Sequence, residues 1–475
     1  MRKIHAALVA SFGLLLAGSL AAGGLHLYGT QRTLPADTAI SGWEVGGLDI
    51  AEVQAGLQAR LQTLETTSLT LKAKDQNGLT LTLKEAGVTY EARAALQALE
   101  SLTDGSLMER VRARWSWPRN LNVGIHLDTA PLRHKLSPDW EQAAFGAPVD
   151  AVRRITGDDR IVYTPGTSSF EVDWPGLELA LQTVIPTQLD SPHALQASRL
   201  ELEIPLAVKP PNITLQVLKD QGVNRKIVQF STSLGASGPG RSFNVEAAAK
   251  AVDGTVLPPN AVFDYGKAIQ KAQTEYGFRE APVIVNGKLQ PGTGGGICQV
   301  SSTLYNAALR SGLEIVERRN HSLPVSYLPK GLDATFAEGY INFRFRNNTG
   351  KYLIIKAGVS GRSLTIKLFG TFPENVTYSV ESKTVKILTP TDKYVSDPSL
   401  PRGGTRVLQQ GKTGYVVESY ITRYVDGKAE ERKLLSRDTY YAQKRVIAIN
   451  RGGMSKSAPP ESPRRQLVED GVKSR

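Results

Sequence analysis

The sequence has 475 residues and a formal net charge of +12. This length predicts two to four domains, and a hydrophobic content of 41% predicts that most of the chain folds. The basic residues are spread along the chain and no nucleic-acid motif is present, so the charge does not indicate nucleic-acid binding. One cysteine excludes an intramolecular disulfide, and the six histidines lack ligand-like spacing, so we expect no metal and no cofactor.

An apolar stretch over residues 4–28 follows a basic N-terminus and contains no Asp, Glu, Lys or Arg. This arrangement is typical of a secretory signal, and the small residues Ser19, Ala21 and Ala22 suit cleavage. The stretch is also long enough to span a bilayer as a helix of about 20 residues. We therefore expect residues 1–30 to be a signal peptide or a membrane anchor, and the protein to be exported to the cell envelope, either membrane-anchored or periplasmic or extracellular.

Residues 39–210 have a mixed α/β pattern that indicates two related units. In the first unit, helical spacing of apolar residues predicts a helix over residues 50–64. Alternating residues then predict strands over 69–73 and 79–83, joined by a hairpin turn at Asn77-Gly78, a pair that accepts the positive φ angles of tight turns.

The second unit is predicted to have strands over residues 160–163 and 169–172, a helix over 177–184 and a strand over 200–208. Lys209-Pro210-Pro211 then breaks the pattern and marks a boundary. In its layout, and in the phrase Val45-Gly46-Gly47-Leu48, the whole region resembles a peptidoglycan-binding domain found beside L,D-transpeptidase and VanW domains. A generic α/β spacer is the alternative.

Residues 213–372 carry the strongest motifs. A helix is predicted to open at Phe243 and to end near Val252. The ordered motifs are Gly294-Gly295-Gly296-Ile297-Cys298-Gln299-Val300-Ser301-Ser302, Glu317-Arg318-Arg319-Asn320-His321-Ser322, Gly331-Leu332-Asp333-Ala334-Thr335 and Phe343-Arg344-Phe345-Arg346-Asn347. This series resembles the VanW domain, a family associated with vancomycin-resistance clusters and bacterial envelopes. It departs from the family pattern at Phe336, where valine is more usual, and at Pro259-Asn260.

The glycine-cysteine motif also has a chemical interpretation of its own. Three glycines permit unusual backbone conformations and a close approach of the chain to a ligand. Apolar residues at helical spacing predict a helix from Ile297 to the stop at Ser311-Gly312, which places Cys298 in its first turn. Unpaired N–H groups there favour an anion, so we expect a lowered thiol pKa, with Gln299 and nearby N–H groups as an oxyanion hole.

A nucleophilic thiol needs a base and a group that orients the base. We therefore hypothesise a catalytic triad of Cys298, His321 and Asp333, whose order resembles that of papain-like and transglutaminase-like enzymes and differs from that of L,D-transpeptidases. The candidate ligand-binding residues are Gly294, Gly295, Gly296, Gln299, Ser301, Ser302 and Asn347. In the alternative interpretation these residues are structural, with a packed cysteine, a turn-capping histidine and a turn-forming aspartate.

Residues 376–450 are predicted to form short strands with glycine turns, over residues 415–424, 432–435 and 445–449. The pattern resembles the β-rich module named for its five glycines, and that resemblance implies binding of N-acetylated sugars. Residues 451–475 are rich in Ser, Pro and mixed charges and are expected to be disordered.

Together these patterns predict an α+β, multidomain protein: a signal or anchor helix, an α/β wall-binding-type region, a mixed α+β VanW-like domain and a small all-β C-terminal module. Two classes of function follow. The first is an envelope enzyme that uses Cys298 to hydrolyse or transfer an amide bond in peptidoglycan. The second is a non-catalytic peptidoglycan-binding or scaffold protein with a ligand pocket at the glycine-cysteine loop. In both, the partner is peptidoglycan or another anionic wall polymer, with membrane contact through an uncleaved N-terminal helix and no nucleic acid.

Overall fold

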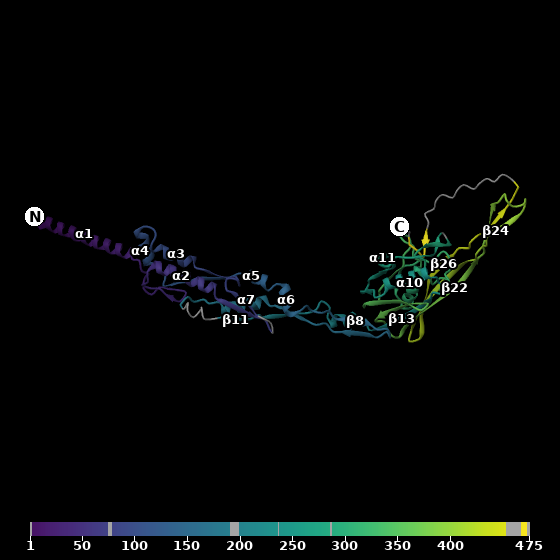
Figure 1. The fold of residues 1–475 in the computed structure, drawn as a ribbon, viewed down its shortest axis with the longest axis horizontal. Helices are drawn as coiled ribbons and strands as arrows, with labels where there is room; N and C mark the ends of the chain where they lie inside the picture. Colours follow the sequence, from purple (N-terminus) through teal and green to yellow (C-terminus); the bar gives the residue numbers. More distant parts are fainter. Residues whose placement is uncertain are drawn as a thin grey trace. The chain divides into compact units, whose positions relative to one another are not determined.

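The computed structural model describes residues 2–74, 78–190, 199–235, 237–285, 287–452 and 467–472. The chain divides into two compact units, one of residues 1–150 and 166–212 and the other of residues 151–165 and 213–475. Both units mix helices and strands, which confirms the expected multidomain α+β class (Figure 1).

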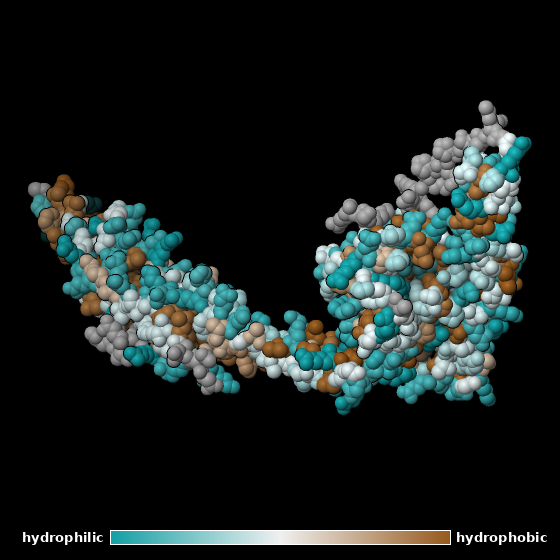
Figure 2. All heavy atoms as spheres, turned by 45° about the vertical axis from the view of Figure 1, so that its right-hand side comes forward, coloured by the Kyte–Doolittle hydropathy of each residue, from teal (hydrophilic) through white to brown (hydrophobic). Residues whose placement is uncertain are grey.

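Helix α1 (Arg2–Gly29) follows the apolar N-terminal stretch. Within the described part of the chain, it is the one helix long and apolar enough to cross a membrane. Its residues are exposed except for Gly29, so the hydrophobic side chains have no protein core to cover them. Figure 2 shows these side chains as hydrophobic surface at the N-terminal end of the first unit. The physical form of α1 therefore suits either a membrane anchor or a signal sequence.

The first half of unit one is built around α2 (Ile50–Glu65), which confirms the predicted helix. Asp49 begins it by accepting a hydrogen bond from the Ala51 N–H, and Val53 and Leu57 are fully buried. The other elements of this half are the sheet β2-β1-β6 (Trp43–Glu44, Ala39–Ile40, Asn120–Leu121) and the helices α3 (Arg93–Ser101) and α4 (Leu107–Trp115).

The second half of unit one contains the predicted hairpin, with β3 (Ser68–Lys72) antiparallel to β4 (Leu79–Thr82). Asn77 of the predicted turn lies outside the described residues. The predicted strand over 200–208 is divided into β11 (Leu200–Glu203) and β12 (Leu206–Lys209), which pair with β3 and with β10 (Ser169–Val172), respectively. The remaining elements are β5 (Val88–Glu91), β7 (Gly124–Leu127), α5 (Ala130–Lys135), α6 (Pro138–Phe145) and α7 (Trp174–Val184).

Unit two has an antiparallel sheet of order β13-β21-β20-β14 (Arg225–Ser233, Ser363–Gly370, Leu353–Ser360, Val256–Leu257). Helices α10 (Pro239–Val252), α11 (Tyr265–Glu275) and α12 (Ile297–Arg310) share one hydrophobic core with it. Around this core lie α9 (Leu215–Asp220), the sheet β15-β19-β18 (Val262–Asp264, Arg344–Arg346, Glu314–Glu317) and the strands β16 (Glu280–Val285) and β17 (Lys288–Thr293).

Helix α12 starts and stops as the sequence predicts, and every residue from Ile297 to Leu309 is buried. A helix that is buried all round belongs at the centre of its domain. Its polar residues therefore need partners from the surrounding loops, and those loops carry the other motifs.

The C-terminal part of unit two is all β. Strands β22 (Val376–Leu388), β25 (Gly414–Val425) and β26 (Lys428–Tyr440) form one sheet, and β23 (Asp392–Ser396), β27 (Arg445–Ile449) and β24 (Thr405–Gln409) form another. Asp426 and Gly427 both have positive φ, as the tight turn between β25 and β26 requires. Composition predicts disorder from Arg451 onward, whereas β28 (Val468–Glu469) pairs antiparallel with β16.

Candidate functional site

The three glycines let the backbone pass close to its neighbours just before α12. Gly294 and Gly296 have φ angles of 89° and 110°, in the region that favours glycine. A Cβ atom on Gly295 would lie 2.4 Å from the carbonyl oxygen of Pro282. The glycines are therefore required by close packing of this loop against β16.

Cys298 lies in the first turn of α12, as predicted, but it is fully buried in the main core. Its thiol accepts a hydrogen bond from the Phe336 N–H at 3.0 Å, and its own N–H donates to Asp470 Oδ1 at 2.7 Å. Burial, followed by the negative charge of Asp470, raises the pKa of the thiol well above its usual value. The expected lowering of this pKa is wrong, because the thiol is buried and because the Asp470 carboxylate already accepts the hydrogen bond of the Cys298 N–H.

His321 and Asp333 form a buried pair. Asp333 Oδ2 lies 2.7 Å from His321 Nδ1 and also accepts a hydrogen bond of 2.7 Å from the His321 backbone N–H. Burial opposes both charges, but the hydrogen bond and charge of each partner outweigh it, so the pKa of His321 is raised and that of Asp333 falls to about 2. The other ring nitrogen, His321 Nε2, is buried and has no hydrogen-bond partner among the residues that the structure describes.

Asp333 has further partners, Tyr440 and Arg318, whose roles the motif analysis missed. Tyr440, at the end of β26, donates its hydroxyl hydrogen to Asp333 Oδ1. Arg318 donates from Nε to the Asp333 carbonyl oxygen at 2.6 Å and from Nη1 to Asp438 at 2.6 Å. The C-terminal sheet thus completes the surroundings of the His321–Asp333 pair.

Two of the three proposed triad residues are brought into contact, and the third lies near them. The segment that begins at Asp333 runs beside α12, where Ala334 accepts a hydrogen bond from Ser301 and Phe336 contacts Cys298. His321 and Cys298 are also both influenced by the charge of Asp470. No hydrogen bond joins the Cys298 thiol to the His321 ring, although both residues are described.

The polar ligand-binding candidates already have partners within the protein. Gln299 donates to Thr232 and to the Ser233 carbonyl oxygen, and it accepts a hydrogen bond from Arg241 Nη1 at 2.7 Å. Ser302 bonds both backbone groups of Ala334. These bonds commit the side-chain donors of Gln299, so an oxyanion hole there has to come from backbone groups.

Asn347 is placed in a different environment from the glycine-cysteine motif. It is fully buried, and its side-chain amide donates to the carbonyl oxygens of Leu257, Pro258 and Lys351. These bonds hold together the loops next to β14 and β20, so the side chain of Asn347 serves the fold in this structure.

A hollow of about 970 Å³ lies beside the glycine-cysteine motif. It is bordered by the start of α10, the loop over residues 323–327, and Glu280, Ala281, Pro282 and Ile284 of β16. Arg241 provides a basic group in its wall, and Glu280 and Asp470 provide acidic groups. The hollow thus combines charged groups with apolar walls, as binding sites for small molecules and short peptides do.

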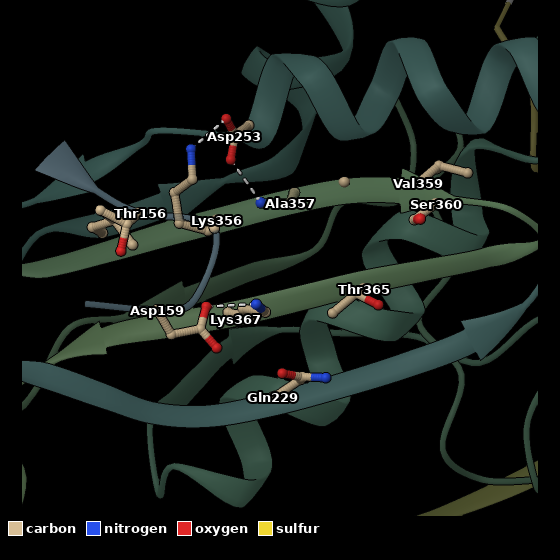
Figure 3. A pocket seen from close by; sticks show the side chains of 13 residues that line it. Thr156, Asp159, Gln229, Asp253, Lys356, Ala357, Val359, Ser360, Thr365 and Lys367 are labelled. Carbon is tan, nitrogen blue, oxygen red and sulfur yellow. Dashed lines mark hydrogen bonds and ion pairs between the residues drawn. The ribbon is translucent and has the colours of Figure 1, made fainter. Parts of the chain in front are cut away.

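A second hollow of about 450 Å³ lies over β20 and β21, next to the turn between β8 (Val152–Ile155) and β9 (Ile161–Thr164). Figure 3 shows that its charged side chains face one another: Lys356 pairs with Asp253, and Lys367 with Asp159. Asp159 also pairs with Lys226. Asp159, paired with Lys367 and Lys226, holds the β8–β9 turn on the sheet, and the Lys356–Asp253 pair joins β20 to the end of α10.

Comparison with known protein families identifies the domains. Residues 240–369 match the family described as VanW like protein, and residues 378–450 match the G5 domain. The chain therefore contains a VanW-like domain followed by a G5 domain, as the motifs indicated. Both domain families are associated with the cell envelope.

Two curated relatives match part of the chain. The uncharacterized protein YoaR of Bacillus subtilis (strain 168) is 38% identical over 169 residues, which cover 36% of this chain and 55% of the relative. The vancomycin B-type resistance protein VanW of Enterococcus faecalis (strain ATCC 700802 / V583) is 34% identical over 112 residues, which cover 22% of this chain and 41% of the relative. The chain thus spans about half the length of these relatives.

Solved structures match the C-terminal module. An IgA1 protease G5 domain is 24% identical and covers 16% of this chain and 88% of its own, with a TM-score of 0.14. The HP0197-G5 structure is 31% identical and covers 15% of this chain and 97% of its own, with a TM-score of 0.12.

Proposed function

We propose that this is an exported cell-envelope protein that binds peptidoglycan, with the hollow beside the glycine-cysteine motif as the binding site for a wall peptide. The observation that carries the proposal is the position of this hollow. It is lined by Gln299, in the first turn of α12, and by Asp470, which accepts the hydrogen bond of the Cys298 N–H. Helix α10 also starts at the hollow, and its N-cap Gly238 offers no side-chain cap. The positive end of α10, together with Arg241, favours an anionic group such as a peptide carboxylate.

The other parts of the chain support a location in the cell envelope. The apolar helix α1 suits export or membrane attachment, and the G5 domain extends the set of envelope-associated modules. A net charge of +12 favours weak attraction to anionic wall polymers. Attachment at the membrane and contact with the wall are therefore compatible within one chain.

Binding is tested by sedimenting the full chain, in detergent, with purified peptidoglycan. We expect the protein to pellet with the wall, and Arg241→Ala to weaken the pelleting several-fold. Arg154→Ala is the matched control, because Arg154 is an exposed arginine of the same unit outside the hollow. Equal pelleting of both variants would show that the hollow is not the binding site. No pelleting of the wild type would reject the proposed function.

A cysteine-dependent amide hydrolase or transferase is the second candidate, and the His321–Asp333 pair favours it. His321 Nε2, which has no hydrogen-bond partner among the described residues, is the ring nitrogen available to exchange a proton with a thiol. In this mechanism Cys298 attacks the amide carbonyl, His321 takes the thiol proton and passes it to the leaving amine, and Asp333 orients the ring. Mass spectrometry of wall digests tests it: Cys298→Ala must abolish any amide cleavage that the wild type shows, and a wild type that cleaves nothing rejects it.

A further inference from the structure

The C-terminal segment of residues 467–472 occupies the start of α12. Asp470 Oδ1 accepts the hydrogen bond of the Cys298 N–H, and the Gly296 backbone also stabilises this carboxylate. Glu469 accepts hydrogen bonds of 2.9 Å from both the backbone N–H and the hydroxyl of Ser322. Both acidic side chains are buried, at 5% and 8% exposure for Glu469 and Asp470. The segment therefore delivers two carboxylates into the centre of the VanW-like domain.

The backbone of the segment is bound as an extended strand. Val468 and Glu469 pair with Val285 and Ile284 at the edge of β16. Further along, the Asp470 N–H donates to the Phe336 carbonyl oxygen at 3.2 Å, and the Val472 N–H donates to the Thr293 carbonyl oxygen at 3.0 Å. Addition of a strand to a sheet edge, with side chains seated in pockets, is a common mode of peptide recognition.

A second observation independently indicates a ligand site here. Within the described part of the chain, His321 Nε2 is fully buried and has no hydrogen-bond partner, and the charges of both Asp470 and Glu469 act on His321. An orphaned buried nitrogen is rare, because leaving it unpaired costs free energy. In addition, Asp470 lines the open hollow of about 970 Å³. A ligand whose carboxylate took the place of the Asp470 carboxylate could therefore extend into this hollow.

We propose that the edge of β16 and the N-terminus of α12 form a binding site for an extended peptide that carries a carboxylate, and that residues 467–472 are its internal, displaceable occupant. The proposal deepens the proposed function, because it names the ligand class of the same region. The occupant is the chain's own segment, and a wall peptide with a free carboxylate has the chemistry to replace it. While the segment is bound, it covers Cys298.

Direct binding tests the site. The chain is shortened to residues 1–466, and the hexapeptide of residues 467–472, with fluorescein on its N-terminus and an amidated C-terminus, is added in trans. We expect saturable binding by fluorescence anisotropy, and at least tenfold weaker binding to the full chain, whose site is occupied. The peptide with Asp470→Asn keeps its length and shape but lacks that carboxylate, so it is expected to bind at least fivefold more weakly. Equal affinity of the two peptides would overturn the carboxylate requirement.

Labelling of the thiol provides a second measurement. Because the sequence has one cysteine, alkylation reports on Cys298 alone. We expect the shortened chain to react with a small thiol reagent at least tenfold faster than the full chain, and the hexapeptide to restore protection. If the shortened chain is unfolded by circular dichroism, Asp470→Ala in the full chain replaces it, with faster labelling expected at unchanged secondary structure. Unchanged labelling in a folded variant would overturn the proposal.

The outcome separates the two proposals. A shortened chain that pellets with peptidoglycan but does not bind the hexapeptide rejects the internal occupant and leaves wall binding intact. A chain that binds the hexapeptide but never pellets with peptidoglycan retains the peptide site and rejects the wall as its partner.

Discussion

The two compact units differ in what they bury. Among the described residues, the first unit buries four polar side chains, Thr38, Thr67, Arg114 and Ser169, whereas the second buries seventeen. Burial of a polar group costs free energy unless it is hydrogen-bonded, so a core of this kind needs a complete network. The first unit is held mainly by apolar packing. The second unit contains a buried polar cluster around α12. Such a cluster is the expected place for chemistry or recognition.

This contrast can be measured within one molecule. All five tryptophans, Trp43, Trp115, Trp117, Trp140 and Trp174, lie in the first unit, so tryptophan fluorescence follows its unfolding. Circular dichroism in the far ultraviolet follows both units. A substitution in the buried polar cluster is therefore expected to shift the unfolding transition of the second unit, seen by circular dichroism. The transition seen by tryptophan fluorescence should stay in place.

The largest effect is expected from Asp333→Ala. This change leaves His321 and Arg318 buried beside a missing carboxylate, and breaking a buried ion pair costs about 3–5 kcal/mol. The matched control in the first unit is Glu178→Ala, whose partner Arg133 lies 3.2 Å away with both side chains largely exposed, so we expect about 1 kcal/mol or less. Denaturant titration of each variant gives the free energies of unfolding. Equal losses would contradict the contrast between the units.

Gly295→Ala should destabilise the second unit by up to about 3 kcal/mol, because its Cβ would meet the Pro282 carbonyl oxygen and the loop must move. Gly157→Ala is the control, since open space surrounds Gly157 in the same unit. Thermal unfolding of both variants checks this prediction. A midpoint for Gly295→Ala that matches the control would show that the loop yields without strain.

The pH dependence of stability gives an intermediate effect. The pKa of Asp333 is lowered in the folded state from 3.8 to about 2, so its contribution of about 2 kcal/mol is present above pH 4 and is lost as the pH falls towards 2. The pKa of His321 is raised above 6.5, so its contribution is present below pH 6.5 and is lost as the pH rises through the raised value. The difference in free energy of unfolding between wild type and Asp333→Asn should therefore be greatest between pH 4 and 6.5. A difference that is constant across pH 2–9 would contradict this assignment.

The smallest effect is expected from Tyr440→Phe, which removes the hydrogen bond donated to Asp333 and the one accepted from the Gly331 N–H, and costs about 1–2 kcal/mol. Tyr441→Phe is the neighbouring control, because Tyr441 is 72% exposed. NMR titration of His321 sharpens the measurement, since an Asp333 without its tyrosine hydrogen bond interacts differently with the imidazole. An unchanged titration curve would remove Tyr440 from the support of the pair.

The sequence patterns correctly predicted the elements that are determined by interactions between neighbouring residues. Apolar spacing gave the bounds of α12 within a few residues, and the alternating pattern gave the hairpin of β3 and β4. The contact between His321 and Asp333 was predicted from short motifs only twelve residues apart. In each case the signal lay in neighbouring residues.

The parts of the site that were missed are distant in sequence. Asp470 is 172 residues from Cys298, and Tyr440 is 107 residues from Asp333. The stretch around Asp470 has the composition of a disordered tail, and its order arises from contacts with β16 that no local pattern encodes. The thiol pKa was predicted in the wrong direction for the same reason: a helix N-terminus indicates an anion, but not whether the chain supplies that anion itself.

The covering of Cys298 also has a consequence for oxidation. Exported proteins meet an oxidising environment, in which an accessible thiol is converted to sulfenic acid or to a mixed disulfide. Here the sulfur is fully buried, lies against the Phe336 backbone and is protonated because its pKa is raised, so peroxide finds neither access nor a thiolate. The same packing therefore shields the thiol from oxidants and keeps it in its reduced form.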